Sequence, residues 1–219
     1  VLGAPDRPML SEKMEQFLMQ ELAHSTASDV PWRLMGNAIP MAKTPVPDLE
    51  SMGFTMPSPS SGADLLWKGR WNLPFYPDTW DGYPWARERL YQMCKAVGVQ
   101  DLVVLTGDSH SFWANHLTDE SGESMGVELG TTGISSPGDF VEQGFDRDTA
   151  ALIDEAFMAH ATDIRWTSNL YQGYLRLVLD REMIRADYVA VSTVELKTYS
   201  TKVIHSEKVA RRSGRLSFL

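Results

Sequence analysis

Asp108 and His110 form the pair in this sequence whose residue types and spacing best suit catalysis. Carboxylate and imidazole groups are common ligands of metal ions in proteins. In an extended segment, residues two positions apart point to the same side, so Asp108 and His110 can bind one ion while Ser109 points away. The spacing therefore predicts Asp108 and His110 as metal ligands. The plainer alternative is that Asp108 caps a turn and His110 is satisfied by hydrogen bonds inside a loop.

Among the other histidines, His116 is the candidate for a further role, because it follows His110 closely. It could serve as a third metal ligand, and its alternative role is to line the next segment. His24, His160 and His205 lie on separate predicted elements with no partner pattern, so we expect packing or surface roles for them.

Two neighbouring serines, Ser135 and Ser136, follow a predicted strand. The sequence around them, G-I-S-S-P, lacks the pattern of a nucleophile elbow. Hydrolysis through one of these serines is therefore a minor alternative.

Several polar and aromatic residues could support the pair or contact a substrate. Asp78 and Asp81 flank Trp80, and turn formation explains them more simply than contact with a substrate or a metal. Trp113 and Asn115 follow the Asp-x-His segment and are candidates to support it, Trp113 through its bulk and Asn115 through its amide.

A strand must position this pair. Residues 101–105 contain a run of apolar side chains that predicts a buried strand, and Gly107 follows at its carboxyl end, where α/β proteins commonly bind ligands. A helix over residues 84–97, ended by Gly98, precedes the strand. Cys94 lies on the apolar face of this helix, so we expect it in the core.

The remaining elements alternate between helices and strands, which predicts an α/β layer architecture. We expect one helix capped by Ser11 and ending near His24, and another capped by Asp148. Asp180 begins a turn signal between two strands. Residues 210–219 have the composition of a basic tail. The predicted strands cover residues 31–39, 125–130, 174–179, 184–194 and 196–204.

Residues 40–84 are rich in Pro, Ser and Gly and predict a long irregular insertion, since prolines exclude long helices and central strands. The second half of this insertion is aromatic, and we expect its aromatic side chains to pin it to the surface. These are Trp67, Trp71, Phe75, Tyr76, Trp80 and Tyr83.

The charge and composition of the chain limit the kinds of partner that it can bind. The chain of 219 residues has a formal net charge of −9, which argues against nucleic acid, because Lys and Arg hold phosphate backbones. An acidic protein that binds phosphate needs a local cation, and a metal ion is the usual one. Cys94 is the only cysteine, so no disulfide forms within the chain. We find neither a membrane-spanning apolar run nor a targeting pattern, so we expect a soluble chain without a targeting signal.

Five groups of stretches, spread in order over most of the chain, form a specific pattern. They are Trp32-Arg-Leu-Met-Gly-Asn37 with Asp78-Thr-Trp-Asp-Gly-Tyr83 before the helix of Arg87, Leu105-Thr-Gly-Asp-Ser-His110 with Trp113, Val127-Glu-Leu129 with Ser135-Ser-Pro-Gly138, Gly173-Tyr-Leu-Arg-Leu177, and Arg185-Ala-Asp187. Each is weak alone, but together and in this order they resemble the PhoD-type alkaline phosphatases and phosphodiesterases of the metallophosphatase group.

The resemblance implies an α/β fold that is the C-terminal half of a metallophosphatase-like α/β/β/α sandwich with two facing sheets. Residues 1–219 are then the C-terminal portion of a PhoD-like catalytic domain, with residues 40–84 as an insertion. Family members carry three further motifs upstream of the position of Val1. These are a strand with the first metal-ligand carboxylates, a bridging Asp and a D-D-H-E-like segment. This chain contains none of those motifs.

The resemblance further implies hydrolysis of phosphate mono- or diesters by a metal-activated water. Asp108 and His110 correspond to the family's late ligands and would complete a multinuclear centre of divalent or trivalent ions, such as calcium or iron. His110 or His116 would protonate the leaving alkoxide. The expected partners are a phosphate-ester substrate and the missing N-terminal half, without which we expect no activity and an absent or weakly held metal.

Two further expectations follow from the resemblance. Family members are often exported, which implies a periplasmic or extracellular location. The alternative function, of a different class, is a non-catalytic interaction fragment, because half a sandwich leaves apolar sheet surface uncovered. Such a fragment would pair with an N-terminal partner or form a homo-oligomer with itself.

Overall fold

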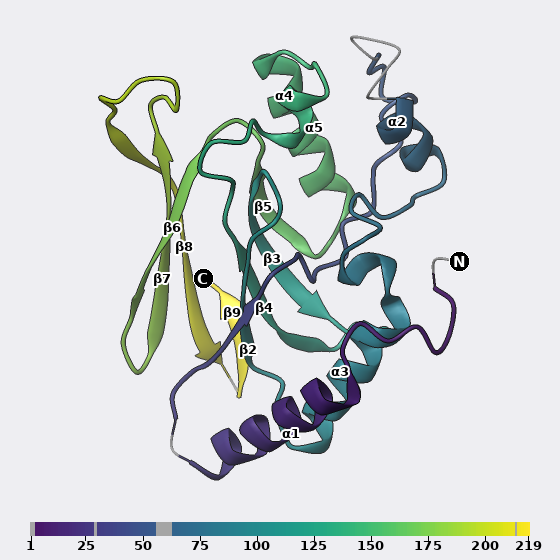
Figure 1. Ribbon diagram of the computed structural model, residues 1–219, viewed down its shortest axis with the longest axis vertical. Coiled ribbons are helices and arrows are strands. Elements are labelled where there is room, and N and C mark those ends of the chain that lie inside the picture. The colour runs from purple at the N-terminus through teal and green to yellow at the C-terminus, as the bar shows by residue number, and fades with distance from the viewer. Residues whose placement is uncertain (1–2, 29, 56–62, 213) are drawn as a thin grey trace.

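The computed structural model describes residues 3–28, 30–55, 63–212 and 214–219. Two β-sheets face each other, and helices cover the other side of the first sheet (Figure 1). The strand order is β1-β2-β4-β3-β5 in the first sheet and β6-β7-β8-β9 in the second. The α/β class expected from the sequence is therefore confirmed.

The first sheet brings the carboxyl ends of three parallel strands to the same end of the sheet. β1 (Arg33–Asn37), β2 (Leu102–Thr106) and β4 (Ser124–Gly130) are these parallel strands. β3 (Phe112–Thr118) lies antiparallel between β4 and β5 (Ile164–Ser168). The sequence predicted β1, β2 and β4, but neither β3 nor β5.

The second sheet is antiparallel throughout, and the predicted hairpin forms within it. Oδ1 of Asp180 accepts hydrogen bonds from the backbone N–H groups of Glu182 and Met183, which closes the turn between the first two strands. The strand expected at residues 196–204 instead begins at Thr201. The strands are β6 (Gly173–Leu179), β7 (Met183–Val191), β8 (Thr201–Arg212) and β9 (Arg215–Phe218).

The prediction of a basic tail over residues 210–219 was wrong. These residues end β8 and form β9, and Leu216 is buried against the inter-sheet core. The arginines are held by carboxylates, since Arg211 contacts Asp101 and Arg215 contacts Glu123. Arginines that face outward on a sheet edge resemble a tail in sequence, although they protect an edge strand.

Apolar side chains fill the space between the sheets. Val103, Phe112 and Val127 of the first sheet meet Ile184 and Tyr188 of the second, and none of the five has exposed surface. Full burial of an aliphatic or phenylalanine side chain stabilises a fold by roughly 1.5–3 kcal/mol, so this cluster holds the two sheets together. The described residues form three of the four expected layers, because no described helix lies over the outer face of the second sheet (Figure 1).

Two of the described helices, α1 and α5, begin at polar caps. The Oγ atom of Ser11 accepts a hydrogen bond from the N–H of Met14, as predicted. The second predicted cap was misplaced by two residues, because Asp146 rather than Asp148 accepts from the N–H of Thr149. Among the described residues, no helix is long and apolar enough to cross a lipid bilayer. The helices are α1 (Glu12–Ala27), α2 (Ala63–Arg70), η1 (Trp80–Gly82), α3 (Pro84–Ala96), α4 (Asp139–Glu142) and α5 (Arg147–His160).

The described part of residues 40–84 belongs to the core more than the sequence indicated. Trp80 and Phe75 are buried in the clusters beneath the helices, whereas Trp67 and Trp71 are exposed. Aromatic side chains therefore hold this segment to the protein, as predicted, but Trp80 and Phe75 do so from inside the core. The described part of the segment also folds back on itself, through the helices α2 and η1 and a β-bridge between Pro45 and Pro74.

Candidate functional site

The turn after β2 places Asp108 at the end of the sheet where the parallel strands stop. Asp108 has a φ of +66°, a left-handed conformation that aspartate tolerates better than most residues. The segment bends here, so the rule that places residues two apart on one side of an extended chain does not apply. The Asp108 side chain is exposed, and among the described residues no hydrogen bond reaches its carboxylate. The carboxylate is thus open to a ligand.

His110 lies on the same turn and is held from two directions. Its carbonyl oxygen accepts a hydrogen bond of 2.8 Å from the hydroxyl of Thr132, in the loop after β4. Its Nδ1 atom lies 3.2 Å from Oε2 of Glu142 on α4. Its side chain is one-third exposed, at 34%. The imidazole therefore combines a fixed backbone with access to solvent.

Ser109 points into the protein and anchors the turn. Its Oγ atom accepts a hydrogen bond of 2.8 Å from Nε1 of Trp113 and lies 2.9 Å from the hydroxyl of Tyr76. Trp113 thus contacts the turn, as the sequence suggested, but through its indole N–H. Asn115, the other expected support, contacts Glu128 instead.

A chain of buried polar groups continues beneath the turn. The hydroxyl of Ser111 lies 2.6 Å from Oδ2 of Asp139 and also contacts Oδ1 of Asn169, while the Tyr76 hydroxyl donates to the same Asp139 oxygen. Asn169 in turn donates to Asp154 through its side chain and its backbone N–H. Burial raises the pKa of Asp139 and raises that of Asp154 to about 6.

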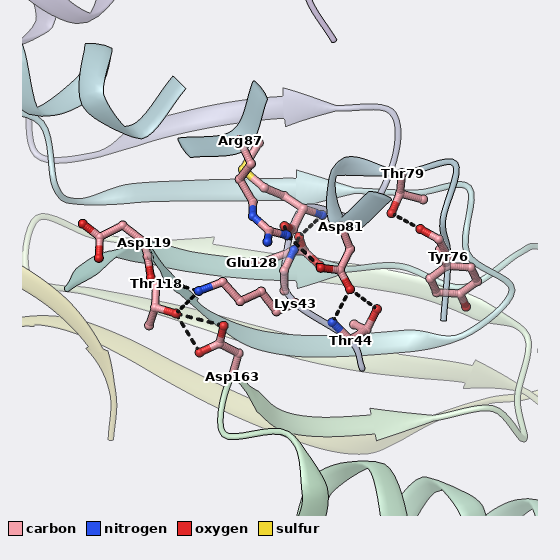
Figure 2. A network of polar contacts seen from close by, with 12 residues as sticks. Lys43, Thr44, Tyr76, Thr79, Asp81, Arg87, Thr118, Asp119, Glu128 and Asp163 are labelled. Carbon is pink, nitrogen blue, oxygen red and sulfur yellow. Dashed lines mark hydrogen bonds and ion pairs between the residues drawn. The ribbon is translucent and has the colours of Figure 1, made fainter. Parts of the chain in front are cut away.

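A second buried network ties residues 40–44 to the sheet (Figure 2). Oε2 of Glu128, on β4, accepts hydrogen bonds from the backbone N–H groups of Met41 (2.5 Å) and Ala42 (2.9 Å). Oε1 accepts from the side-chain amide of Asn115 at 3.0 Å. Glu128 has no exposed surface, and burial raises its pKa despite these hydrogen bonds.

The network extends to an ion pair at the start of α3. Nη1 of Arg87 lies 3.1 Å from Oδ1 of Asp81, and both side chains are buried. Oδ2 of Asp81 accepts from the backbone N–H of Thr44 at 2.8 Å. Asp81 therefore fixes the insertion to the helix, rather than forming only a local turn as the sequence suggested.

At its other end the network reaches the strand β3 (Figure 2). Nζ of Lys43 donates to the hydroxyl of Thr118 and to the carbonyl oxygen of Asp119. The Thr118 hydroxyl lies within 3.0 Å of both carboxylate oxygens of Asp163. Burial raises the pKa of Asp163. These contacts are structural, because they lie inside the protein and connect three chain segments.

His116 is not brought to the turn. It lies on β3, in the layer between the sheets, where its ring meets the ring of Phe218 edge to face at 5.0 Å. Strands rise about 3.3 Å per residue, so His116 sits about 13 Å along β3 from its first residue, Phe112. Burial lowers the pKa of His116. The geometry therefore supplies no support for a catalytic or ligand role of His116.

The other histidines have packing and surface roles, as expected. His205 stacks on Trp166 with ring centroids 4.1 Å apart, and its Nε2 atom lies 2.9 Å from Oε1 of Glu207. His160 is exposed at the end of α5 and contacts the side chain of Asn72. Neither histidine adjoins the turn through any contact that the structure describes.

Asp108 and His110 suit two positions of a metal site but not a complete one. A carboxylate and an imidazole bind many divalent ions. Within the described ranges, however, no group of three or more His, Cys, Asp or Glu side chains could hold a metal ion. The described residues therefore supply at most these two side chains as metal ligands at the turn.

Sequence reasoning missed the residues that hold the turn. Asp139 and Glu142 lie on α4, a single helical turn that no apolar pattern announced, and Asn169 follows the unpredicted strand β5. Each contacts the turn only through tertiary structure. Neither periodicity nor local spacing in the sequence points to them.

Comparison with known proteins gives a consistent result. A family model described as PhoD-like phosphatase matches residues 1–188. Alkaline phosphatase D of Bacillus subtilis (strain 168) is 29% identical over 194 residues, which cover 84% of this chain and 27% of that protein. A solved structure described as the structure of PhoD matches with a TM-score of 0.67 at 23% identity, over 98% of this chain and 36% of the other. The chain thus spans about a third of these relatives.

Proposed function

The chain belongs to the PhoD-like phosphatase family, and from this premise we propose that it is part of a metal-dependent enzyme that hydrolyses phosphate mono- or diesters. The observation that carries the proposal is the turn after β2. It presents the carboxylate of Asp108 and the imidazole of His110 at the end of the sheet where the parallel strands stop. Beneath them, Ser109 accepts a hydrogen bond from Trp113 and Ser111 donates one to Asp139. Hydrolysis of a phosphate ester needs groups that bind a metal ion or transfer a proton, and the side chains of Asp108 and His110 are of that kind.

Each residue of the turn has a distinct proposed role. When bound, divalent or trivalent ions such as calcium or iron would offset phosphate charge and lower the pKa of the attacking water. Asp108 would bind through its exposed carboxylate. His110 would either bind through Nε2, since Nδ1 faces Glu142, or give a proton to the leaving alkoxide. We favour His110 over His116 as the acid, because His116 packs between the sheets against Phe218.

We propose that the remaining ligands come from the part of the protein that this chain does not include. The chain covers 27% of one relative and 36% of another, and its described residues hold no complete metal site. The partner of this chain is then the upstream half of the same protein. Residues 1–219 alone are expected to be inactive, and residues 40–84 act as an insertion of the catalytic domain.

The test uses the longest natural form of the protein. Asp108→Asn keeps the size of the side chain and its tolerance for a positive φ, and His110→Gln keeps a polar group. We expect each variant to lose about 100-fold or more in hydrolysis of bis(4-nitrophenyl) phosphate or 4-nitrophenyl phosphate. Bound metal, measured by plasma mass spectrometry, should fall in Asp108→Asn.

The control is Asp148→Asn on α5, which removes the same charge from an exposed position. It should keep wild-type metal content and rates. If Asp108→Asn and His110→Gln also kept both, the assignment of the site would be wrong. If the wild-type protein hydrolysed neither ester, the proposed function itself would be wrong.

A second candidate function is supported by the apolar edge of the first sheet. Leu34 on β1 and Phe17 on α1 are exposed and line one groove. This arrangement favours a non-catalytic fragment that associates with a partner or with itself as a homo-oligomer. A cooperatively folded monomer in sedimentation velocity would count against this candidate.

We also propose that the protein is exported to the periplasm or the extracellular space, on the strength of the family resemblance alone. Fractionation of the native cells tests this. Recovery of the protein with a cytosolic marker would contradict it.

A further inference from the structure

Glu142, which the sequence did not identify, contacts the ring of His110. His110 has two ring nitrogens, and among the described residues only Nδ1 has a protein partner, Oε2 of Glu142 at 3.2 Å. An ionised carboxylate only accepts hydrogen bonds, so this contact requires a hydrogen on Nδ1. In the neutral imidazole, Nε2 then carries the free lone pair. The contact therefore selects one of the two tautomers of His110.

Both partners of this contact are fixed by buried neighbours. Asp139 and Glu142 lie three residues apart on α4 and therefore share one face of this helical turn, which points at residues 109–111. Asp139 holds this face through the hydroxyl of Ser111 at 2.6 Å. On the other side, the Thr132 hydroxyl holds the carbonyl oxygen of His110 at 2.8 Å.

The entry to α4 is equally constrained. A Cβ atom at Gly138 would lie 1.7 Å from the carbonyl oxygen of Asn169, so the backbone at residue 138 packs directly on the loop after β5. Phe140, in the middle of α4, has no exposed surface. The position of Glu142 is thus set by the core. The Glu142 side chain itself is more than half exposed, so its contact with His110 orients the ring rather than stabilising the fold.

We propose that Glu142 is a positioning residue that holds His110 in the Nδ1–H tautomer and turns Nε2 toward the open edge of the sheet. For its catalytic consequence the inference rests on the proposed function, because Nε2 is the atom that would bind a metal ion or face a substrate. Carboxylates that accept from the second ring nitrogen of a ligand histidine fix its tautomer and raise its basicity. The tautomer itself can be measured without metal or activity.

The first experiment measures the tautomer by NMR. The protein is labelled with ¹⁵N in its histidines, and the His110 signals are assigned from the His110→Gln variant. At pH 8, where histidines are ordinarily neutral, the Nδ1 and Nε2 shifts report which nitrogen carries the hydrogen. We expect the Nδ1–H form in the wild type and in Glu142→Gln, whose amide oxygen still accepts. Glu142→Ala should show a mixture of tautomers.

The matched control is Glu155→Ala, an exposed glutamate on α5 whose loss changes the net charge equally. Its His110 signals should equal those of the wild type. The inference is overturned if the wild type shows the Nε2–H form, or if Glu142→Ala leaves the tautomer unchanged.

The second experiment measures kinetics in the longest natural form. Loss of a carboxylate that orients a ligand histidine ordinarily costs about 10–100-fold in metal affinity or activity. Because Glu142 is exposed, we expect about a tenfold fall in kcat for Glu142→Ala with KM unchanged, and partial rescue in Glu142→Gln. Wild-type rates in Glu142→Ala would overturn the positioning role. An inactive wild type would contradict the proposed function, while the NMR result would still decide the tautomer.

Discussion

At the scale of single residues, the hydroxyl of Ser111 joins the candidate site to the loop after β5. Ser111 has no exposed surface, and its Oγ atom lies 2.6 Å from Asp139 Oδ2 and contacts Asn169 Oδ1. Ser111→Ala leaves Oδ1 of Asn169 without its hydrogen-bond donor, whereas Oδ2 of Asp139 keeps the Tyr76 hydroxyl. An unsatisfied buried group costs about 1–3 kcal/mol. We expect the variant to lower the free energy of unfolding in urea by about that amount.

The control for this prediction is Ser135→Ala. Ser135 is exposed, so we expect neither stability nor hydrolysis to change. A Ser111→Ala variant as stable as the wild type would show that the hydroxyl does not join these elements. Loss of hydrolysis in Ser135→Ala, or labelling of Ser135 by a phosphonate inhibitor, would instead favour the serine-hydrolase alternative.

Local spacing identified Asp108 and His110, but it could not identify the side chains that hold the turn. Asp139, Glu142 and Asn169 lie 28, 32 and 58 residues from the turn residues that they contact. A lone Asp, Glu or Asn in a loop carries no periodic signal, because its role depends on which segments the fold brings together. The opposite error occurred at His116, for which closeness to His110 in the sequence suggested a shared role. The strand β3 instead carries His116 away from the turn and against Phe218.

At the scale of elements, the buried ion pair between Asp81 and Arg87 joins η1 to α3. The two charged groups lie 3.1 Å apart, and Asp81 also accepts from the backbone N–H of Thr44. Removing one partner of a buried pair ordinarily costs about 3–5 kcal/mol, because the other charge stays buried and unpaired. We expect Asp81→Ala to destabilise the protein by about that amount in urea unfolding. The double variant Asp81→Ala with Arg87→Met should recover part of the loss.

An exposed pair of the same chemistry provides the control. Glu50 and Arg70 form a bidentate contact, but both side chains are about half exposed. Exposed pairs contribute roughly 0–1 kcal/mol, so Glu50→Ala should have little effect. Equal losses in Glu50→Ala and Asp81→Ala would contradict the importance given to burial.

Whole elements were predictable where the sequence has one strong period. The apolar run before Gly107 predicted β2, and the Pro84 start and Gly98 end predicted α3. β3 was not predicted, because it is buried on both faces and yet contains the polar residue Asn115. Asn115 is tolerated there because Glu128 accepts a hydrogen bond from its side-chain amide. The sequence cannot reveal that partner, which lies on a neighbouring strand.

At the scale of the whole molecule, buried carboxyl groups make stability depend on pH. Burial raises the pKa of Asp154 to about 6, and it also raises those of Glu128, Asp139 and Asp163. A raised pKa means that the folded state favours the protonated acid. The contribution of Asp154 is therefore complete below the unfolded pKa of about 3.9 and is lost as pH rises through about 6. This loss amounts to about 3 kcal/mol.

We expect the free energy of unfolding to fall between pH 4.5 and pH 7.5, as measured by urea titration at each pH. Asp154→Asn should show a smaller fall, because an amide does not ionise in this range. A wild type whose stability rises over this interval would contradict the prediction.

Asp187 has the opposite effect at acid pH. Burial favours a higher pKa, but hydrogen bonds from Ser206, Arg176 and Arg185 outweigh it and lower the pKa of Asp187 to about 2. The stabilisation is present above the unfolded pKa of about 3.9 and is lost as pH falls through about 2, a change of about 3 kcal/mol. Between pH 4 and pH 2, we expect the melting temperature of Asp187→Asn to fall less steeply than that of the wild type. An equally steep fall in the two proteins would contradict this prediction.

Among the described residues, β1 also forms an uncovered lateral edge of the first sheet. β1 is paired on one side only among the described residues, and Leu34 on this strand is 48% exposed beside Phe17 of α1, which is 59% exposed. An edge strand with apolar neighbours associates with other chains unless it is covered. The relatives of this chain are about three times its length, so they have the residues to cover such an edge.

The same substitution should therefore act differently in the two forms of the protein. In residues 1–219 alone, Leu34→Lys should reduce self-association in sedimentation velocity, because a charge on an edge strand blocks pairing. We expect additional residues of a longer natural form to cover this edge, and burying the lysine there should instead destabilise the fold by about 1–3 kcal/mol. If Leu34→Lys were neutral in the longest form, β1 would remain an outer edge there. The upstream half would then complete the site from another direction.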